Sequence, residues 1–183
     1  ESEKRAALQA SLQDAQIKAL KAQINPHFLF NSLTLLGYTA LEENAPRTEE
    51  IAYGLSDLLR YSLRNISSTV ELQEEMEILQ QYLEIQKFRF GDRLQSEIFL
   101  APGLKTMQVP CMVLLPLVEN AVIHGAEPLT RAVTISVKAY HEANEVVMEV
   151  CDDGVGMAPE IVEAINQGQS IGKKDSLGML NVV

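Results

Sequence analysis

The chain has 183 residues, of which 46% are hydrophobic and 22% charged, which suits one medium domain or a small domain with a helical arm. Its 15 basic and 25 acidic residues give a formal net charge of -10, so nucleic acid is not expected as a partner. No run of about 18 apolar residues is present, so no membrane contact is expected in this fragment. The sequence begins without Met and already in helical rhythm, which indicates a piece of a longer protein.

The two cysteines, Cys111 and Cys151, lie far apart in apolar stretches. This pattern predicts two buried thiols in a reducing compartment and not a disulfide framework or a metal cluster. A small anionic ligand remains compatible with the acidic chain, because backbone N–H groups and a metal ion can supply a local positive field.

The first third of the chain is predicted to be helical. Residues 3–24 are rich in Ala, Leu, Gln, Glu and Lys, and apolar residues continue at spacings of three or four up to about residue 40. Two apolar stripes run along this region, so more than one side must be buried. Residues 42–47 contain Asn and Pro and predict a turn before a second helix. A helical hairpin that dimerises into a four-helix bundle satisfies this pattern.

At about residue 68 the pattern changes from all-helical to α+β. Ser68 and Glu71 have the spacing of a capping box, which predicts that a third helix begins there and ends before the Gly-Asp turn at 91–92. A buried helix is predicted over residues 112–124. Alternating apolar residues predict three strands, at 96–101, 132–140 and 145–151, of which the last two have hairpin spacing.

The segment 20–36, LKAQINPHFLFNSLTLL, places His27 directly after Pro26 in an apolar run, with Asn31 four residues later. Apolar runs of this kind normally belong to a core. Periodicity alone therefore allows a satisfied core histidine as readily as a functional one.

Asn120 and His124 share one face of the apolar helix in PLVENAVIHG, because they are four residues apart. A core polar pair would have the same pattern. In DDGVGM, Gly154 and Gly156 would let a ligand approach the backbone, and Asp152 could accept a hydrogen bond from an amino group. An ordinary Asp-Gly turn would also look like this.

Gly178 in SLGMLNVV is predicted to open a helix whose free N–H groups suit a phosphate chain. A plain loop-to-helix junction with a glycine near its start is the alternative. Taken singly, none of these three motifs specifies a function.

Their order does. An Asn-bearing helix, a strand hairpin, D-x-G-x-G at a strand end, a loop and a Gly-led helix follow one another as in the GHKL ATP-binding fold. With INPHFLFN and LEIQKFRFGDRL upstream, residues 18–183 resemble the LytS-type sensor histidine kinases. The resemblance implies an α+β protein in three parts: a coiled-coil signalling helix (1–24), a dimerising and histidine-phosphotransfer hairpin (25–67) and a GHKL α/β-sandwich ATP-binding domain (68–183). The family fold continues further, so this domain is expected to be incomplete.

The resemblance implies that His27 accepts the phosphate of ATP. Neutral imidazole is a competent nucleophile near neutral pH. Asn31, one turn on, can orient the ring but cannot take its proton. Phe28 stands where other histidine kinases have an acidic residue, so the base is not identified. We expect His27 at the edge of the bundle core, partly exposed, with Phe28, Leu29 and Leu33 buried.

ATP and Mg²⁺ are the cofactors that the resemblance implies. Asn120 would hold Mg²⁺, Asp152 would accept the adenine amino group, and Gly154 and Gly156 would form the wall of the site. Gly178 would close over the phosphates. A basic residue often stands at position 123, which here is Ile; His124 would substitute for it in part, or would only pack.

Two further features concern the phosphate side of the site. Ser176 stands where the second glycine box usually begins with Gly. Lys173 and Lys174 could offset phosphate charge, or could equally belong to a solvated loop.

The implied function is that of a cytoplasmic transmitter from a membrane-anchored sensor. It would phosphorylate His27 and pass the phosphate to an aspartate of a response-regulator receiver domain, working as a homodimer. The bend expected at Pro26 would let movement of the 3–24 helix gate this reaction. A non-catalytic coiled-coil scaffold with a degenerate nucleotide module is one alternative. A GHKL ATPase is another, disfavoured because Pro116 occupies the usual position of the hydrolytic Glu and Glu119 lies about 100° away from Asn120 around the helix.

Overall fold

The structure is a computed structural model that describes residues 25–63, 68–157 and 162–163. It contains two compact units, one up to Ser56 and one from Asp57 onward, and each is described by itself. The expected helical arm at 1–24 lies outside the described residues. Within those residues, no helix is long and apolar enough to cross a membrane.

The first unit is a helical hairpin of α2 (Pro26–Glu42) and most of α3 (Pro46–Ser62). Asn25 is extended and caps α2, because its side-chain oxygen accepts a hydrogen bond from the Phe28 N–H at 3.2 Å. Pro26 is therefore the first residue of a helix, where its missing N–H costs nothing, and not a bend inside one. Asn44, with φ 54°, forms the turn between the helices.

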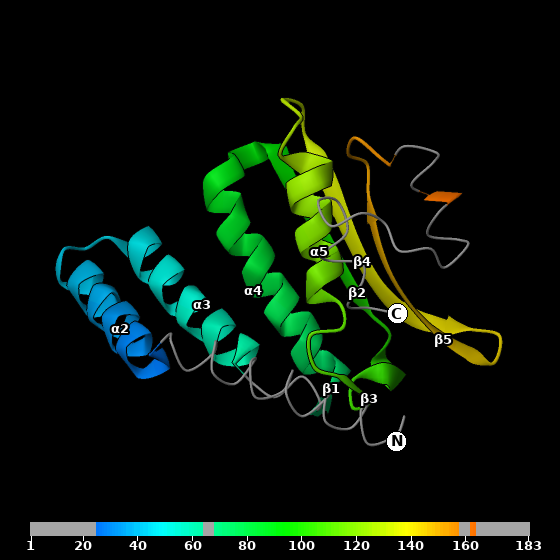
Figure 1. Cartoon of the computed structure of the whole chain (residues 1–183), viewed down its shortest axis with the longest axis horizontal. Helices are drawn as coiled ribbons and strands as arrows, with labels where there is room; N and C mark the ends of the chain where they lie inside the picture. The colour runs from blue at the N-terminus through cyan, green and yellow to red at the C-terminus, as the bar shows by residue number, and fades with distance from the viewer. Residues whose placement is uncertain (1–24, 64–67, 158–161, 164–183) are drawn as a thin grey trace, which may run out of the picture. The chain divides into compact units, whose positions relative to one another are not determined.

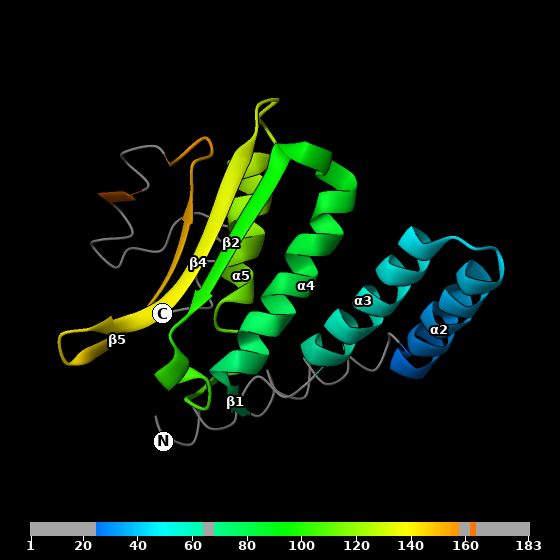
Figure 2. The ribbon, with the colours of Figure 1, turned by 180° about the vertical axis from the view of Figure 1, so that it is seen from behind.

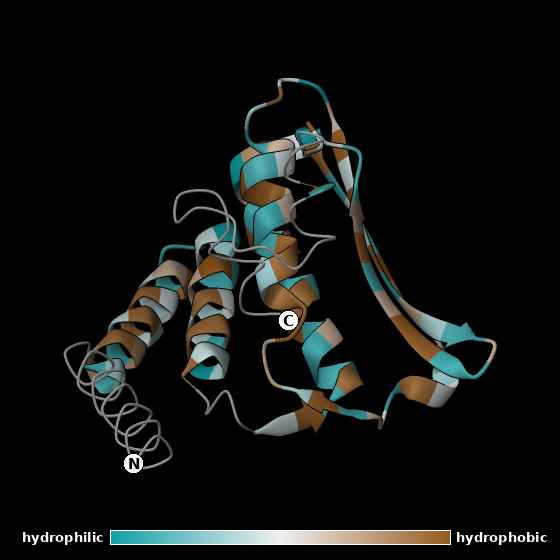
Figure 3. Ribbon diagram, turned by 45° about the vertical axis from the view of Figure 1, so that its right-hand side comes forward, coloured by the Kyte–Doolittle hydropathy of each residue, from teal (hydrophilic) through white to brown (hydrophobic). Residues whose placement is uncertain are grey.

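Small residues form the contact between these helices. Gly37 and Ala40 of α2 are buried, and a Cβ atom on Gly37 would lie 2.9 Å from the Tyr53 ring. The predicted burial of Phe28 is wrong for the single chain, because its side chain is 66% exposed, and Leu29 and Leu33 are only half-buried. Among the described residues of this unit, α3 covers one face of α2, and several large apolar side chains of α2 stay exposed. Brown segments mark the hydrophobic residues along the helix (Figure 3).

The second unit is α+β. Its helices are α4 (Leu72–Phe90), α5 (Leu115–Asn120) and the π-helix η3 (Ala121–Ala126), with short 3-10 turns η1 (Gly91–Arg93) and η2 (Pro102–Leu104). Its strands are β1 (Thr69–Glu71), β2 (Leu94–Leu100), β3 (Gln108–Pro110), β4 (Val133–Glu142) and β5 (Glu145–Asp152).

The described strands form two sheets. In the larger one the order is β2-β4-β5, with β2 parallel to β4 and β4 antiparallel to β5. Helices α4 and α5 lie on the same face of this sheet, as the two opposite views show (Figures 1 and 2). The smaller sheet is the antiparallel pair β1-β3.

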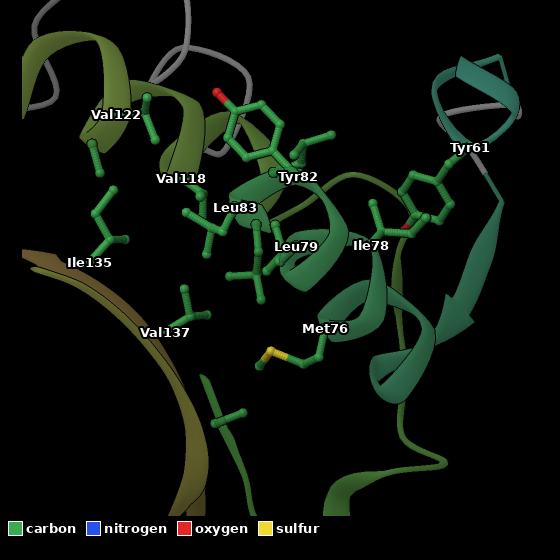
Figure 4. Packing of buried hydrophobic residues seen from close by; sticks show 14 of the residues in the cluster. Tyr61, Met76, Ile78, Leu79, Tyr82, Leu83, Val118, Val122, Ile135 and Val137 are labelled. Atoms are coloured by element: carbon green, nitrogen blue, oxygen red, sulfur yellow. The ribbon is translucent and has the colours of Figure 1, made fainter. Parts of the chain in front are cut away.

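The core lies between the larger sheet and these helices. Alternate residues of β4 are buried, and they meet the buried stripe of α4 (Figure 4). Burying one such Leu, Ile or Val side chain contributes about 1.5–3 kcal/mol to folding. The residues of this contact include Met76, Leu79, Leu83, Val118, Val122, Ile135 and Val137.

The predicted capping box at Ser68 is wrong. Residues Thr69–Glu71 form β1, and the Ser68 carbonyl accepts a hydrogen bond from the Cys111 N–H at 3.0 Å. α4 begins at Leu72, and its first free N–H donates to the Met107 carbonyl at 2.8 Å. A neighbouring loop therefore accepts the hydrogen bond from the free N–H at the start of the helix, because no local side chain caps it.

Two other expectations need correction. The helix predicted over 112–124 begins only at Leu115, because Met112 takes a positive φ of 64° in the segment before it. Cys111 is buried as predicted, whereas Cys151 is exposed. Cys151 lies opposite Ser136 on the sheet face away from α4 and α5, which explains its exposure.

Candidate functional site

The first part of the site is the helical segment α5–η3. Val118, Ala121 and Val122 point into the core, which leaves Asn120 half-buried at the end of α5 and His124 exposed on η3. The change from α- to π-helix falls directly after Asn120, and π-helical turns are frequent at functional sites.

The second part is the D-x-G-x-G turn at the end of β5. The Gly154 N–H donates to Asp152 Oδ1 at 2.9 Å, and the Val155 N–H donates to the Gly125 carbonyl at 3.2 Å. The second bond joins the turn to η3. The structure thus brings Asp152 and the Asn120 helix, predicted separately, into one site.

Two glycines make this contact sterically feasible. A Cβ atom on Gly125 would lie 2.5 Å from Asp152 Oδ1, and one on Gly154 would lie 2.4 Å from the Gly125 carbonyl oxygen. No real Cβ atom tolerates such distances. Gly156 has φ 74°, in the left-handed region that favours glycine, so this position needs the backbone freedom of a glycine.

Arg131 holds the same turn from the other side. Its guanidinium donates to the backbone carbonyl of Asp153 and, at 3.4 Å, to that of Gly154. The Asp153 carboxylate accepts a hydrogen bond from the Thr134 N–H at 2.7 Å. We did not predict the roles of Arg131 and Asp153 from the sequence. The doubled Asp of DDGVGM was the only available signal for them.

Two more arginines hold the loop between η3 and β4. Arg89 of α4 forms an ion pair with Glu127, and Arg93 donates to the Leu129 carbonyl at 2.6 Å. Both arginines belong to the FRFGDR segment. The loop that carries Arg131 is therefore anchored on the end of α4.

An adenine nucleotide fits the chemistry of this site. The Asp152 side chain is exposed, so its carboxyl group can accept a hydrogen bond from an exocyclic amine while it also accepts one from the Gly154 N–H of its own turn. No group of three or more His, Cys, Asp or Glu side chains able to hold a metal occurs among the described residues. Asn120 offers a side-chain oxygen, a ligand type that suits a Mg²⁺ ion whose other ligands are phosphates and water.

His27 lies in the first unit, exposed in the first turn of α2. The amide nitrogen of Asn31 lies 3.4 Å from His27 Nδ1 and 3.5 Å from Nε2, so the contact orients the ring weakly. The predicted exposure of His27 is confirmed. Gly178, Ser176, Lys173 and Lys174 lie outside the described residues.

The sheet, the helices on one face and the strand-end glycine turn define a GHKL-type ATPase module. Residues 109–182 match the family described as Histidine kinase-, DNA gyrase B-, and HSP90-like ATPase, and residues 15–94 match the Histidine kinase family. The chain is thus similar to sensor histidine kinases over both its helical part and its α+β part.

Curated relatives include Sensor histidine kinase YesM of Bacillus subtilis, 35% identical over 90% of this chain and 28% of that protein. Sensor protein kinase HptS of Staphylococcus aureus is 35% identical over 85% of this chain and 30% of its own length. The chain thus spans less than a third of the length of these relatives. The solved histidine kinase domain from Erythrobacter litoralis EL346 superposes with a TM-score of 0.40 at 13% identity, over 73% of this chain and 75% of that one.

Proposed function

We propose that this chain is the transmitter of a two-component sensor histidine kinase. It would transfer the γ-phosphoryl group of ATP to His27 and then to an aspartate of a response-regulator receiver domain. The observation that carries the proposal is the D-x-G-x-G turn hydrogen-bonded to the Asn120 helix, in a chain that also bears an exposed His27 on a helical hairpin.

Bound Mg²⁺-ATP would supply the phosphoryl group and much of the charge compensation. Asp152 would accept the adenine amine, Gly154 and Gly156 would line the base, and Asn120 would ligate Mg²⁺. His124 is exposed beside this set and would contact the phosphates. Gly178 would contribute backbone N–H groups to the phosphates.

The unprotonated ring nitrogen of His27 would attack phosphorus, with ADP leaving. The other nitrogen would carry a proton that is then lost. Neither Phe28 nor Asn31 can take that proton, and the exposed ring is accessible to water, which we assign as the acceptor.

A homodimer is proposed from the apolar surface of the hairpin. Large apolar side chains of α2 and α3 are exposed in the single chain, which two hairpins would bury as a four-helix bundle. They are Phe28, Leu35, Leu36, Tyr38, Leu41, Tyr53 and Leu55. Because ATP and receiver domains are cytoplasmic, we place this part of the protein in the cytoplasm, with a membrane anchor elsewhere in the longer protein.

Labelled ATP and Mg²⁺ test the proposal. The chain should gain acid-labile, alkali-stable label, and His27→Gln should abolish it. His141→Gln is the matched control, because His141 is an exposed histidine on β4 outside the proposed site. Label that persists in His27→Gln, or none in the wild type, would refute the kinase. Phosphate release without label on the protein would indicate an ATPase. The absence of both phosphate release and label would indicate a scaffold.

A further inference from the structure

Glu75 is a fully buried carboxylate in the middle of the core. It belongs to α4 and has 0% exposure. Its Oε1 accepts a hydrogen bond from the Leu114 N–H at 3.0 Å, and its Oε2 accepts from the Met112 N–H at 3.1 Å and from the Tyr61 hydroxyl. Three donors from two other segments therefore converge on one side chain.

Such a group is costly unless all its hydrogen bonds are made. A buried carboxylate loses several kcal/mol of hydration, which only close donors offset. Burial and the bond to Glu75 raise the pKa of Tyr61, so its hydroxyl stays protonated and donates throughout the physiological range. An apolar residue would serve packing better, so the arrangement calls for a role other than stability alone.

The two backbone donors lie in the segment that leads into the nucleotide-site helix. Met112 has the positive φ of 64°, which a non-glycine residue adopts only when its surroundings hold it there. The Leu114 carbonyl accepts the first bonds of α5, from Leu117 at 3.0 Å and Val118 at 3.1 Å. Asn120 follows within about one and a half turns. Glu75 thus accepts hydrogen bonds from the segment directly before α5, the helix that carries Asn120.

The third donor, Tyr61, lies on the last turn of α3 and is 2% exposed. Its ring packs at the Ile78 edge of the core, away from β4 (Figure 4). Its hydroxyl is also 3.5 Å from the Met112 N–H. This last turn of α3 belongs to the second unit, and within that unit Tyr61 joins it to the segment before α5.

We propose that Glu75 is a positioning residue for the nucleotide site, and that its bond with Tyr61 couples the last turn of α3 to α5. The proposal rests on nucleotide binding at Asn120, as proposed above. A shift of the last turn of α3 moves Glu75 and Met112, and with them the start of α5. Since binding coupling is reciprocal, nucleotide at Asn120 tightens the end of α3.

Two substitutions separate the parts of this link. Tyr61→Phe removes the hydroxyl that donates to Glu75 and leaves both backbone hydrogen bonds of Glu75 in place. It therefore removes only the hydrogen bond that links Glu75 to α3. In Glu75→Gln one of the two accepting oxygens is replaced by an NH₂ group. That NH₂ group is a donor and lies opposite one of the two backbone N–H groups, so the substitution should disturb the start of α5 itself. Tyr82→Phe is the matched control, because Tyr82 is a buried tyrosine of α4 in the same core.

Hydrogen exchange of the full chain reads out the coupling in peptides covering 57–63 and 111–118, with 133–152 as the reference. Without ligand, Tyr61→Phe should speed exchange in both peptides by at least about threefold and leave the reference unchanged. Tyr82→Phe should not reproduce that pair of changes. Loosening of 57–63 alone in Tyr61→Phe would show a local packing role and overturn the coupling.

A non-hydrolysable ATP analogue with Mg²⁺ provides the second arm, with binding followed by calorimetry. In the wild type it should slow exchange at 57–63, and Tyr61→Phe should bind the analogue but lose that protection. Glu75→Gln should bind at least about tenfold more weakly. Protection that survives in Tyr61→Phe overturns the proposal. Absence of any wild-type binding refutes the nucleotide function instead, while the ligand-free arm still decides the coupling.

Discussion

The backbone N–H of Val155 donates to the carbonyl oxygen of Gly125 at 3.2 Å, and this bond joins the two halves of the proposed nucleotide site. Gly125 lies in η3, the helical segment that follows Asn120, and Val155 lies in the turn that follows Asp152. The two chain segments approach each other backbone to backbone. The relative position of the proposed metal ligand and the proposed adenine acceptor therefore depends on glycine at the point of contact.

Gly154→Ala should abolish or strongly weaken nucleotide binding. Its Cβ would lie 2.4 Å from the Gly125 carbonyl oxygen, so the turn must shift, at a cost of about 1–3 kcal/mol. Calorimetric titration with Mg²⁺-ATP analogue should show at least about a fivefold loss in affinity. Gly103→Ala is the control, because a Cβ there meets nothing within 4 Å. Equal affinity for wild type and Gly154→Ala would contradict the prediction.

Arg131→Ala should weaken nucleotide binding with little change in thermal stability. The exposed guanidinium orders the Asp153 and Gly154 carbonyls of the turn. Its loss should therefore reduce the free energy of nucleotide binding by on the order of 1 kcal/mol, or about fivefold in Kd. Arg131→Lys should recover only part of this, since one ammonium does not span both carbonyls. Full affinity in Arg131→Ala would rule out a role in holding the turn.

Ile123→Lys should strengthen nucleotide binding. Ile123 lies three residues after Asn120 and is 48% exposed, so the change removes little packing and adds a cation near the proposed phosphates. The chain is acidic, with a net charge of -10, so an added cation should improve affinity by about two- to fivefold at low salt. The gain should shrink at high salt because of screening. A gain independent of salt would point to a different cause.

Glu119→Gln should raise stability at neutral pH and lose this effect in acid. Partial desolvation raises the pKa of the Glu119 carboxyl above its usual range. The folded state therefore binds this proton more tightly than the unfolded state does, and the stability it contributes is lost as the pH rises through the raised pKa.

The gain for Glu119→Gln should be at most about 0.5 kcal/mol, because the side chain is largely exposed and screened. Urea unfolding at pH 7 and at pH 4 checks this, and the difference between variant and wild type should appear only at the higher pH. A difference that is the same at both pH values would exclude ionisation of Glu119 as its cause.

Much of the second unit could be predicted from the alternation of apolar residues. The strands over 96–101, 132–140 and 145–151 lie within two residues of β2, β4 and β5 at each end, because a sheet with one covered face imposes a period of two. The start of α4 could not be predicted in this way. Ser68 and Glu71 have the spacing of a cap, but pairing of β1 with β3 satisfies their backbone instead.

Burial was harder to predict for single residues. Phe28 lies in an apolar run but is exposed, because among the described residues of the first unit only α3 packs on α2. Cys151 lies in an apolar strand but is exposed, because it points to the uncovered face. An apolar stretch of sequence predicts a surface that is stable when buried, but it does not identify the segment or molecule that covers this surface.

The sequence by itself indicated the chemistry that we propose for this protein: a histidine after proline, an asparagine on an apolar helix and a glycine turn after a strand, in the order typical of one family. These are local patterns, in which residue type and spacing carry the information. Only the tertiary structure decided how the parts meet. The carboxylate of Glu75 accepts hydrogen bonds from backbone groups 37 and 39 residues away, and the guanidinium of Arg131 donates to carbonyls 22 and 23 residues away. Contacts over such separations form only when the folded chain brings the segments together, and for Glu75 also excludes water.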